Sequence, residues 1–233
     1  MTARGRSPAS RGRGRPPGPT PQAERTRQHL YDTAMAMFAA RGEAATTLRE
    51  IAGQAGVSVG LLYRYFPGKA ALVLAFYDER AELYAARAAK MPAGPWAERF
   101  LFALRTSLAV LAEHRATLSA LLPILVRDDA VGLLAPDASG ARERVRQVFH
   151  RAVIDATNAP PPPLAAALGN LLYVAHLGII LGWLLDRSPG ARATAALLEL
   201  LEQTTPLASL VLPFAEPMIL ATDAVLRDAL LGD

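Results

Sequence analysis

The chain has no cysteine among its 233 residues. Disulfide bonds and metal sites built from thiolates are therefore excluded. The first residues also have no apolar run of the kind that forms a secretory signal, so the cytoplasm is the expected location. We expect neither a metal ion nor another cofactor.

The residue patterns of common enzyme sites are missing as well. The four histidines lie far apart and none has an HExxH-like spacing: His29, His114, His150 and His176. There is no glycine-rich phosphate loop and no nucleophile elbow. Asp128 and Asp129 are adjacent, but two carboxylates in an expected loop are usually solvated. The sequence therefore does not indicate an enzyme.

Charge is distributed unevenly along the chain. Residues 1–77 hold eleven basic side chains against four acidic ones, whereas residues 78–233 hold fourteen against seventeen. The N-terminal part thus has a formal charge of +7 and the rest −3. A concentrated positive field favours a polyanionic partner, because phosphates release counterions when basic side chains neutralise them. A solvated run of charge is the plain alternative.

Residues 1–22 are rich in glycine, proline and arginine, and we expect them to form a disordered basic arm. The stretch Arg13-Gly14-Arg15-Pro16 resembles the core of an AT-hook, in which Arg13 and Arg15 would lie in a narrow minor groove. A four-residue motif is weak. The alternative is an arm that raises affinity for DNA by charge alone.

From Ala23 onward the pattern is helical, without the alternation that indicates a sheet, so the expected fold class is all-α. A composition of 52% hydrophobic and 20% charged residues is enough for a buried core. Glycine, proline and capping residues divide the helices. The expected helices are 24–41, a short one from Thr47 to Gly56, 58–66, 69–90, 95–113, 116–126, 138–157, 163–186, 190–211 and 214–231, with Pro213 separating the last two.

Two of the short helices have the spacing of a helix-turn-helix. Thr47 and Glu50 predict a capping box, and Ser58 caps the second helix after the turn at residues 55–58. Leu62 and Phe66 point to a shared core, which leaves the other faces of the second helix free. A helix of this kind presents its first turns to the major groove of DNA.

The same residues resemble the signature of the TetR/AcrR family of bacterial transcriptional regulators. The resemblance lies in residues 47–52 (TLREIA), residues 55–58 (AGVS), Gly60, residues 62–63 and 65–66 (LY and YF), and Lys69. It implies an N-terminal three-helix DNA-binding domain, here residues 23–68, joined by a long helix to a ligand-binding and dimerisation domain, here residues 69–233. The expected partners are double-stranded operator DNA, a second copy of the chain and a small-molecule effector.

The resemblance also implies roles for individual residues. Thr47, Tyr63 and Lys69 are expected to contact DNA phosphates. The remaining positions expected at the DNA are Ser58, Val59, Gly60, Leu61, Arg64 and Tyr65. Among the variable positions Val59, Leu61 and Arg64, only Arg64 can donate strongly to a base. Tyr65 replaces a frequent histidine and is equally compatible with packing, and residues 67–68 (PG) replace a more usual polar pair.

The segment 164–185 is long enough to span a bilayer and has no formally charged residue. Asn170, Tyr173 and His176 interrupt it on one side, which favours a buried helix in a soluble receptor over a membrane span. These three residues are the candidate hydrogen-bonding groups of a ligand site, although a histidine on an apolar helix is often a satisfied core residue. The candidate wall residues are Phe102, Leu121, Phe149 and Trp183.

Together these features predict a homodimeric repressor that releases a palindromic operator on binding a small apolar effector. Helices 163–186 and 190–211 are the expected dimer face, and Gly178 and Gly182 would allow another helix to approach closely. An architectural DNA-binding protein without a ligand is the competing hypothesis, and the large apolar body argues against it.

Overall fold

The computed structural model describes residues 20–127 and 139–231, and these residues contain helices but no strand. The all-α expectation is confirmed. The α-helices are α1 (Pro21–Arg41), α2 (Leu48–Gln54), α3 (Val59–Tyr65), α4 (Lys69–Ala88), α5 (Trp96–Leu111), α6 (Arg115–Arg127), α7 (Ser139–Ile154), α8 (Pro162–Leu185) and α9 (Arg192–Leu226). Short helical turns, η1 (Ala112–His114), η3 (Pro189–Ala191) and η4 (Arg227–Leu231), flank α6 and α9.

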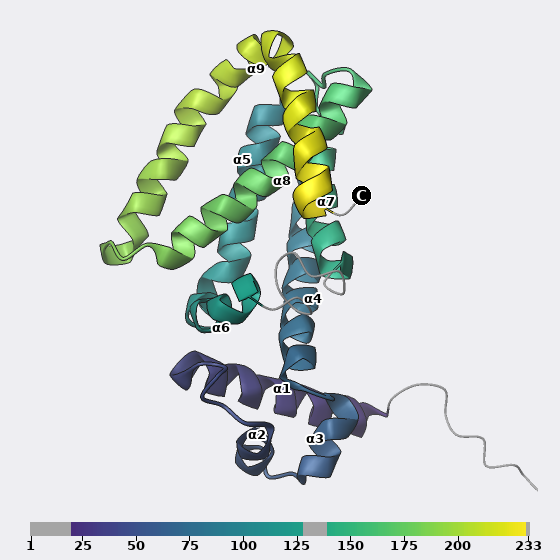
Figure 1. The fold of residues 1–233 in the computed structure, drawn as a ribbon, viewed down its shortest axis with the longest axis vertical. Helices are drawn as coiled ribbons and strands as arrows, with labels where there is room; N and C mark the ends of the chain where they lie inside the picture. The colour runs from purple at the N-terminus through teal and green to yellow at the C-terminus, as the bar shows by residue number, and fades with distance from the viewer. Residues whose placement is uncertain (1–19, 128–138, 232–233) are drawn as a thin grey trace, which may run out of the picture.

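Helices α1, α2 and α3 form a small unit at one end of the molecule (Figure 1). Their boundaries follow from caps: Thr20 accepts from the Ala23 amide at the start of α1, and Gly42 ends that helix at φ 86°, a conformation that favours glycine. The unit encloses its own core, whose fully buried members include Leu30, Phe38, Ile51, Leu62 and Phe66.

Helix α4 joins this unit to the rest of the chain (Figure 1). Its first half packs into the core of the small unit through Leu72, Val73 and Phe76. Its second half packs, through Tyr84 and Ala88, into the larger core that α5, α7, α8 and α9 build. One rigid element is therefore shared by both hydrophobic cores.

Helices α5, α7, α8 and α9 build the larger core around residues such as Phe100, Leu104 and Phe149. Helices α7 and α8 approach closely at Gly169, where an added Cβ would lie 3.1 Å from the His150 Cα. The buried Arg99 of α5 donates to the backbone oxygens of Ala152 and Arg151 in the last turn of α7, where Arg151 also accepts from the Asp155 amide. These contacts fix α7 between α4, α5 and α8.

The prediction that one helix ends before Pro213 and another begins after it is wrong. Helix α9 continues from Arg192 to Leu226 with Pro206, Pro213 and Pro217 inside it. Each proline lacks the N–H that would bond to the carbonyl four residues earlier, so the helix bends instead of stopping. Figure 1 shows α9 as two limbs that double back on each other, with the second limb lying against the body.

Candidate DNA interface and internal cavity

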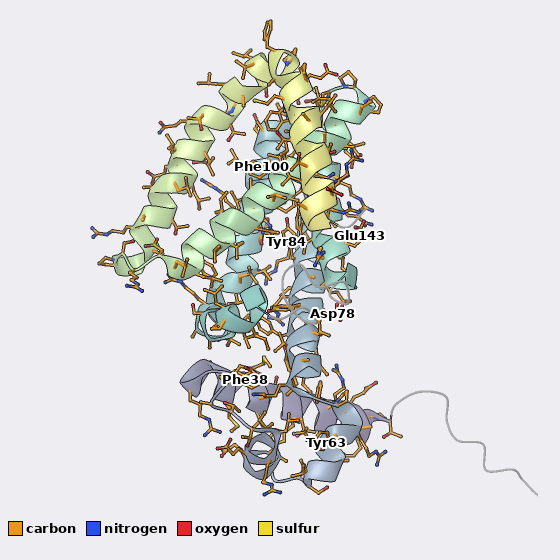
Figure 2. All side chains as sticks on the ribbon, in the orientation of Figure 1. Phe38, Tyr63, Asp78, Tyr84, Phe100 and Glu143 are labelled. Atoms are coloured by element: carbon orange, nitrogen blue, oxygen red, sulfur yellow. The ribbon has the colours of Figure 1, made fainter. Side chains whose placement is uncertain are left out.

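The second helix of the helix-turn-helix presents its polar side chains outward. Ser58 caps α3 by accepting from the Leu61 amide at 3.2 Å, and Leu62 and Phe66 anchor it to the core. Tyr63 is 51% exposed and lies at the end of the molecule remote from the body (Figure 2). This is the arrangement that the sequence analysis expects of a helix entering a major groove.

The other expected contact positions of α3 divide into two groups. Gly60 and Arg64 are exposed, whereas Val59, Leu61 and Tyr65 are half-buried. Tyr65 and Val59 pack against the core of the small unit, which supports the packing alternative for Tyr65. Arg13 and Arg15 lie outside the described residues.

Thr47 closes the capping box expected at the start of α2. Its hydroxyl accepts from the Glu50 amide at 3.2 Å, and its own amide donates to Glu50 Oε2 at 2.8 Å. Hydrogen bonds from Thr47 lower the pKa of Glu50, with a further contribution from Arg41 at 3.2 Å. The Thr47 amide is thus occupied by an internal carboxylate, with which a DNA phosphate would have to compete.

Lys69 also has an internal partner. Its Nζ lies 2.8 Å from Glu43 Oε1 and donates to the Glu43 backbone oxygen at 3.1 Å. This pair ties the start of α4 to the loop after α1. The sequence offered no sign of it, because Glu43 and Lys69 lie 26 positions apart. Arg27 was not predicted to take part either, and its guanidinium lies 5.0 Å from the centroid of the Phe66 ring.

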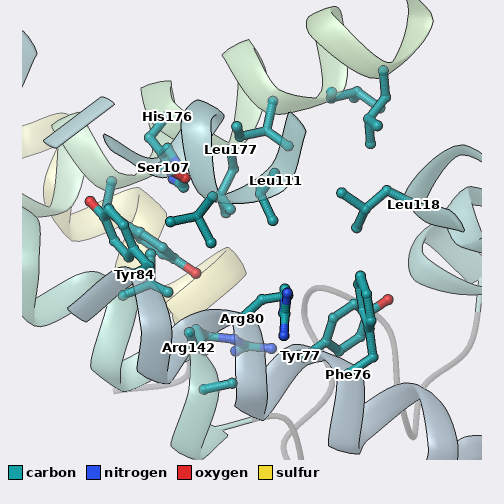
Figure 3. Close-up of a pocket in the computed structure, with 18 of the residues that line it drawn as sticks. Phe76, Tyr77, Arg80, Tyr84, Ser107, Leu111, Leu118, Arg142, His176 and Leu177 are labelled. Carbon is teal, nitrogen blue, oxygen red and sulfur yellow. Dashed lines mark hydrogen bonds between the residues drawn. The ribbon is translucent and has the colours of Figure 1, made fainter. Parts of the chain in front are cut away.

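The larger unit contains a cavity of about 160 Å³ between α4, α5, α6, α7 and α8 (Figure 3). Tyr173 and His176 line it, as expected of a ligand site. The lining residues are Phe76, Tyr77, Arg80, Ala81, Tyr84, Ser107, Val110, Leu111, Leu118, Leu122, Ala141, Arg142, Val145, Tyr173, His176, Leu177, Ile180, Leu181 and Leu184.

The remaining expected ligand residues lie outside this lining. Asn170 Oδ1 accepts a hydrogen bond from His150 Nε2 at 2.7 Å, and Asn170 Nδ2 donates to Asp223 Oδ1 at 2.7 Å, which ties α7, α8 and α9 together. Phe149 is fully buried behind the cavity, with its ring centroid 4.7 Å from that of His176. Leu121 and Trp183 belong to the core of the small unit, and Phe102 is half-buried on α5. A spacing pattern shows which residues share one face of a helix, but not toward which neighbour that face is turned. In the structure these residues are turned away from the cavity.

His176 is the central polar group of the cavity. Its Nε2 shares a 2.8 Å hydrogen bond with Ser107 Oγ, while its Nδ1 is buried without a hydrogen-bond partner. Burial lowers the pKa of His176 to about 3, so the ring is neutral at physiological pH. The Tyr84 ring stacks parallel to it, and the buried Tyr84 hydroxyl also has no partner.

Two arginines, Arg80 and Arg142, line the same cavity and were not predicted. Arg80 pairs with Glu79 and hydrogen bonds to His114 Nε2. Burial and the neighbouring Arg80 charge lower the pKa of His114, which favours the neutral ring that accepts from Arg80. No local pattern distinguishes an arginine on the inner face of α4 or α7 from a solvated one, so only the packing identifies them.

A broad apolar surface covers the outer side of α9. Its exposed large side chains are Leu197, Leu200, Leu207, Leu210, Val211, Phe214, Met218 and Val225. Ala175, Gly178 and Gly182 are exposed on α8, and an added Cβ at either glycine would meet nothing within 4 Å. Such a surface, large and contiguous with small residues, is typical of a protein interface.

Two helical segments, Pro162–Leu185 and Pro189–Ala229, are long and apolar enough to cross a membrane by length and composition. The first is 44% buried, packs against α5, α7 and α9 and contains the buried Asn170 and His176, whereas the second is 17% buried. Within the described ranges, no group of three or more His, Cys, Asp or Glu side chains is placed to hold a metal ion.

Comparison with known proteins agrees with this architecture. The profile described as "Bacterial regulatory proteins, tetR family" matches residues 30–76. The HTH-type transcriptional regulator AcrR of Shigella flexneri is 36% identical over 78 residues, which span 32% of this chain but only 36% of that protein. The HTH-type transcriptional repressor KstR of Rhodococcus jostii (strain RHA1) is 27% identical over 72% of this chain and 76% of its own length.

Solved structures share the whole architecture. A TetR-family transcriptional regulator from Streptomyces coelicolor superposes with a TM-score of 0.59 at 26% identity, covering 87% of this chain and 89% of that one. A TetR regulator from Nitrosomonas europaea ATCC 19718 gives the same TM-score of 0.59 at 21% identity over 79% and 98% of the two chains, a likeness of fold alone. Residues 30–76 therefore contain the helix-turn-helix domain of the bacterial tetR regulatory proteins, and the chain as a whole is similar to TetR-family transcriptional regulators.

Proposed function

We propose that this protein is a homodimeric repressor that binds a palindromic operator and releases it when a small molecule fills the cavity. The supporting observation is the position of α4. This helix begins at Lys69, directly after the recognition helix, and contributes Phe76, Arg80 and Tyr84 to the cavity lining. A ligand that shifts α4 therefore also shifts the anchor of α3.

A second connection runs through α6. Leu118 lines the cavity and also belongs to the core that contains Leu30 and Phe38 of α1. The DNA-binding unit, residues 23–68, thus contacts the ligand-binding and dimerisation unit, residues 69–233, through two cavity helices. The ligand must bind the state unable to hold DNA more tightly than the other, and by linkage operator DNA weakens ligand binding by the same factor.

The DNA contacts in this proposal come from the exposed end of the small unit. Tyr63, Arg64 and Ser58 face outward on α3. Thr47 and Lys69 reach phosphates by exchanging the carboxylates of Glu50 and Glu43 for them. The formal charge of +7 on residues 1–77 favours this exchange through counterion release.

The second copy of the chain covers the apolar surface of α8 and α9. Leu210 and Phe214 are 72% and 88% exposed in one chain, and burying such groups is the main driving force of association. Two copies related by a two-fold axis would place two recognition helices on successive half-sites. Because a partner chain covers the apolar surfaces of α8 and α9, these long apolar helices need no membrane. This is in keeping with a cytoplasmic regulator.

Selection of bound sequences from a random double-stranded DNA library tests the proposal with purified full-length protein. An enriched inverted repeat is the expected result, and its spacing reports the separation of the two α3 helices. Tyr63→Ala should weaken binding to the selected repeat, whereas the control Gln147→Ala, at an exposed position of α7, should not. A well-folded dimer that enriches no sequence would contradict the operator-binding role.

A further inference from the structure

The lining of the cavity is mostly apolar but also contains positive charge. Its lining contains two cationic side chains, Arg80 and Arg142, and no aspartate or glutamate among the described residues. His176 adds no charge because it is neutral. A neutral acceptor can also hydrogen bond to a guanidinium group, but an anion forms the stronger, charge-assisted hydrogen bond.

Arg80 is held at the cavity by contacts on both sides. Its side chain is 14% exposed, and it pairs with the partly exposed Glu79 and hydrogen bonds to His114 Nε2. Its Nε is buried and has no hydrogen-bond partner among the described residues. A ligand can take up this donor only after the side chain turns toward the cavity, and the neighbouring carboxylate offsets part of the guanidinium charge.

Two further polar atoms beside the cavity lack a partner among the described residues. The Tyr84 hydroxyl and His176 Nδ1 are buried, and both residues line the cavity, although neither atom is exposed to the space itself. A buried polar group without a partner costs free energy that a ligand can recover by bonding to it. In Figure 3 Ser107 and His176 lie on one side of the cavity and Arg80 on the other, so polar groups face the space from two directions.

The volume limits the body of the ligand. A cavity of about 160 Å³ is close to the size of an apolar cavity that accommodates one benzene ring, about 150 Å³. The aromatic rings of Phe76, Tyr77, Tyr84 and Tyr173 contribute to the walls. A single ring can pack edge-to-face against such walls.

We propose that the effector is a small aromatic carboxylate of benzoate size, with its carboxylate on Arg80 and its ring among the aromatic walls. This assignment deepens the proposed function and replaces the purely apolar effector expected from the sequence. The Tyr84 hydroxyl donates a further hydrogen bond to the carboxylate or to a ring substituent.

The carboxylate would also act on a contact with the DNA-binding unit. Glu79 pairs with Arg80 and lies near Tyr31 of α1, where burial and then the Glu79 carboxylate raise the pKa of the Tyr31 hydroxyl. A ligand carboxylate competes with Glu79 for the Arg80 guanidinium, which changes the partners of Glu79 next to Tyr31. The anionic group thus acts where α4 meets α1, which is the position from which a ligand can disturb the helix-turn-helix.

Calorimetric titration of the purified full-length protein, without DNA, tests the assignment with three probes that share one ring. Benzoate is anionic, benzamide is neutral and benzylamine is cationic. We expect benzoate to bind at least about tenfold more tightly than benzamide, because charge-assisted hydrogen bonds are the stronger kind, and benzylamine not to bind. Equal or tighter binding of benzamide, or no binding of benzoate, would overturn the assignment.

Two variants locate the carboxylate. Arg80→Met should reduce benzoate affinity to that of benzamide, whereas the control Arg87→Met, an exposed arginine on the same helix, should leave it unchanged. Tyr84→Phe removes only a hydroxyl and should weaken benzoate binding by about threefold or more. Should Arg80→Met fail to fold, unchanged benzoate affinity in Tyr84→Phe would overturn the assignment by itself.

Operator binding, measured separately with the selected repeat, distinguishes this assignment from the proposed function. Benzoate binding with the expected preferences but without loss of operator affinity would contradict the ligand response and leave the assignment of the cavity standing. Operator release by benzamide but not by benzoate would support the ligand response and overturn the carboxylate assignment.

Discussion

Lys69 illustrates how one side chain can serve two partners. In the described structure its ammonium group binds Glu43, yet it lies at the first turn of α4, next to the recognition helix. The Glu43 side chain is only 14% exposed, so moving Lys69 to a phosphate leaves a largely buried carboxylate without its cation, a cost that DNA binding has to offset. With this cost offset, the residue is compatible with both a structural tie and a phosphate contact.

Replacing Lys69 with Met should weaken binding to all DNA sequences and lower the slope of log affinity against log salt by about one. The physical reason is the loss of one phosphate contact per site. Fluorescence anisotropy over a salt series measures both quantities. Glu43→Gln, which removes the carboxylate from the internal pair and leaves Lys69 in place, should retain the slope. An unchanged slope in Lys69→Met would show that Lys69 pairs with Glu43 and does not contact a phosphate.

His176 makes stability depend on pH. Burial depresses its pKa from 6.5 to about 3 in the folded protein, so between these values the unfolded chain binds one more proton. The contribution is fully present above about pH 6.5 and is lost as the pH falls toward 3. We expect the free energy of unfolding to fall by about 1.4 kcal/mol per pH unit in this window from this residue.

Urea denaturation between pH 4 and pH 7, at fixed protein concentration, measures this effect. The variant His176→Gln, which cannot titrate, should show a slope smaller by about one proton than the wild type. His29→Gln, at an exposed position of α1, is the matched control and should keep the wild-type slope. Identical slopes in wild type and His176→Gln would show that His176 does not carry the dependence.

At the scale of elements, the two faces of α8 have different requirements for glycine. Gly169 faces α7, where an added Cβ would lie 2.9 Å from His150 Cδ2 and 3.1 Å from its Cα. Gly178 lies on the opposite, exposed face, with nothing within 4 Å of an added Cβ. Backbone atoms of α7 cannot move aside as a flexible side chain can, so the two positions should respond differently to alanine.

We expect Gly169→Ala to lower the free energy of unfolding by about 1–3 kcal/mol through overpacking. Gly178→Ala should leave the folded chain unharmed or slightly more stable, because alanine favours a helix. Chemical denaturation of both variants gives the comparison. A Gly178→Ala protein that dimerises less well would place that glycine in the interface, and equal stability of the two variants would contradict the close approach of α7 and α8.

Most helices could be predicted because their ends are encoded locally. Thr47, Ser58 and Gly42 act on atoms within a few residues, and each marks a boundary in the structure as expected. Pro213 was misjudged, because a proline removes one hydrogen bond but packing on both sides can keep the helix continuous. Where packing between helices decides whether a helix ends, the neighbouring residues in the sequence do not reveal that end.

At the scale of the whole molecule, the exposed apolar surface of α9 requires a cover. Leu210→Glu places a charge at a position that is 72% exposed in a single chain, so the fold of that chain should be unaffected. In a dimer the same charge would be buried without a partner, at a cost large enough to separate the subunits. We expect a monomer with strongly reduced affinity for the inverted repeat.

Light scattering coupled to gel filtration measures the mass of this variant, and circular dichroism checks its fold. Ala86→Glu, which introduces the same charge on an exposed position of α4, should remain dimeric. A Leu210→Glu protein that is still dimeric would move the interface away from this surface of α9.

The sequence by itself determined the helical class, the helix-turn-helix and the residues that anchor α3, because caps and hydrophobic spacing act over a few residues. It also placed Tyr173 and His176 among candidate ligand residues. Only the tertiary structure decided that Arg80 and Arg142 face the cavity, that Asn170 serves the packing of α7 and α9 instead, and that Glu43 holds Lys69. These contacts join residues far apart in the chain, and the rotation and docking of whole helices, which no local pattern encodes, bring them together.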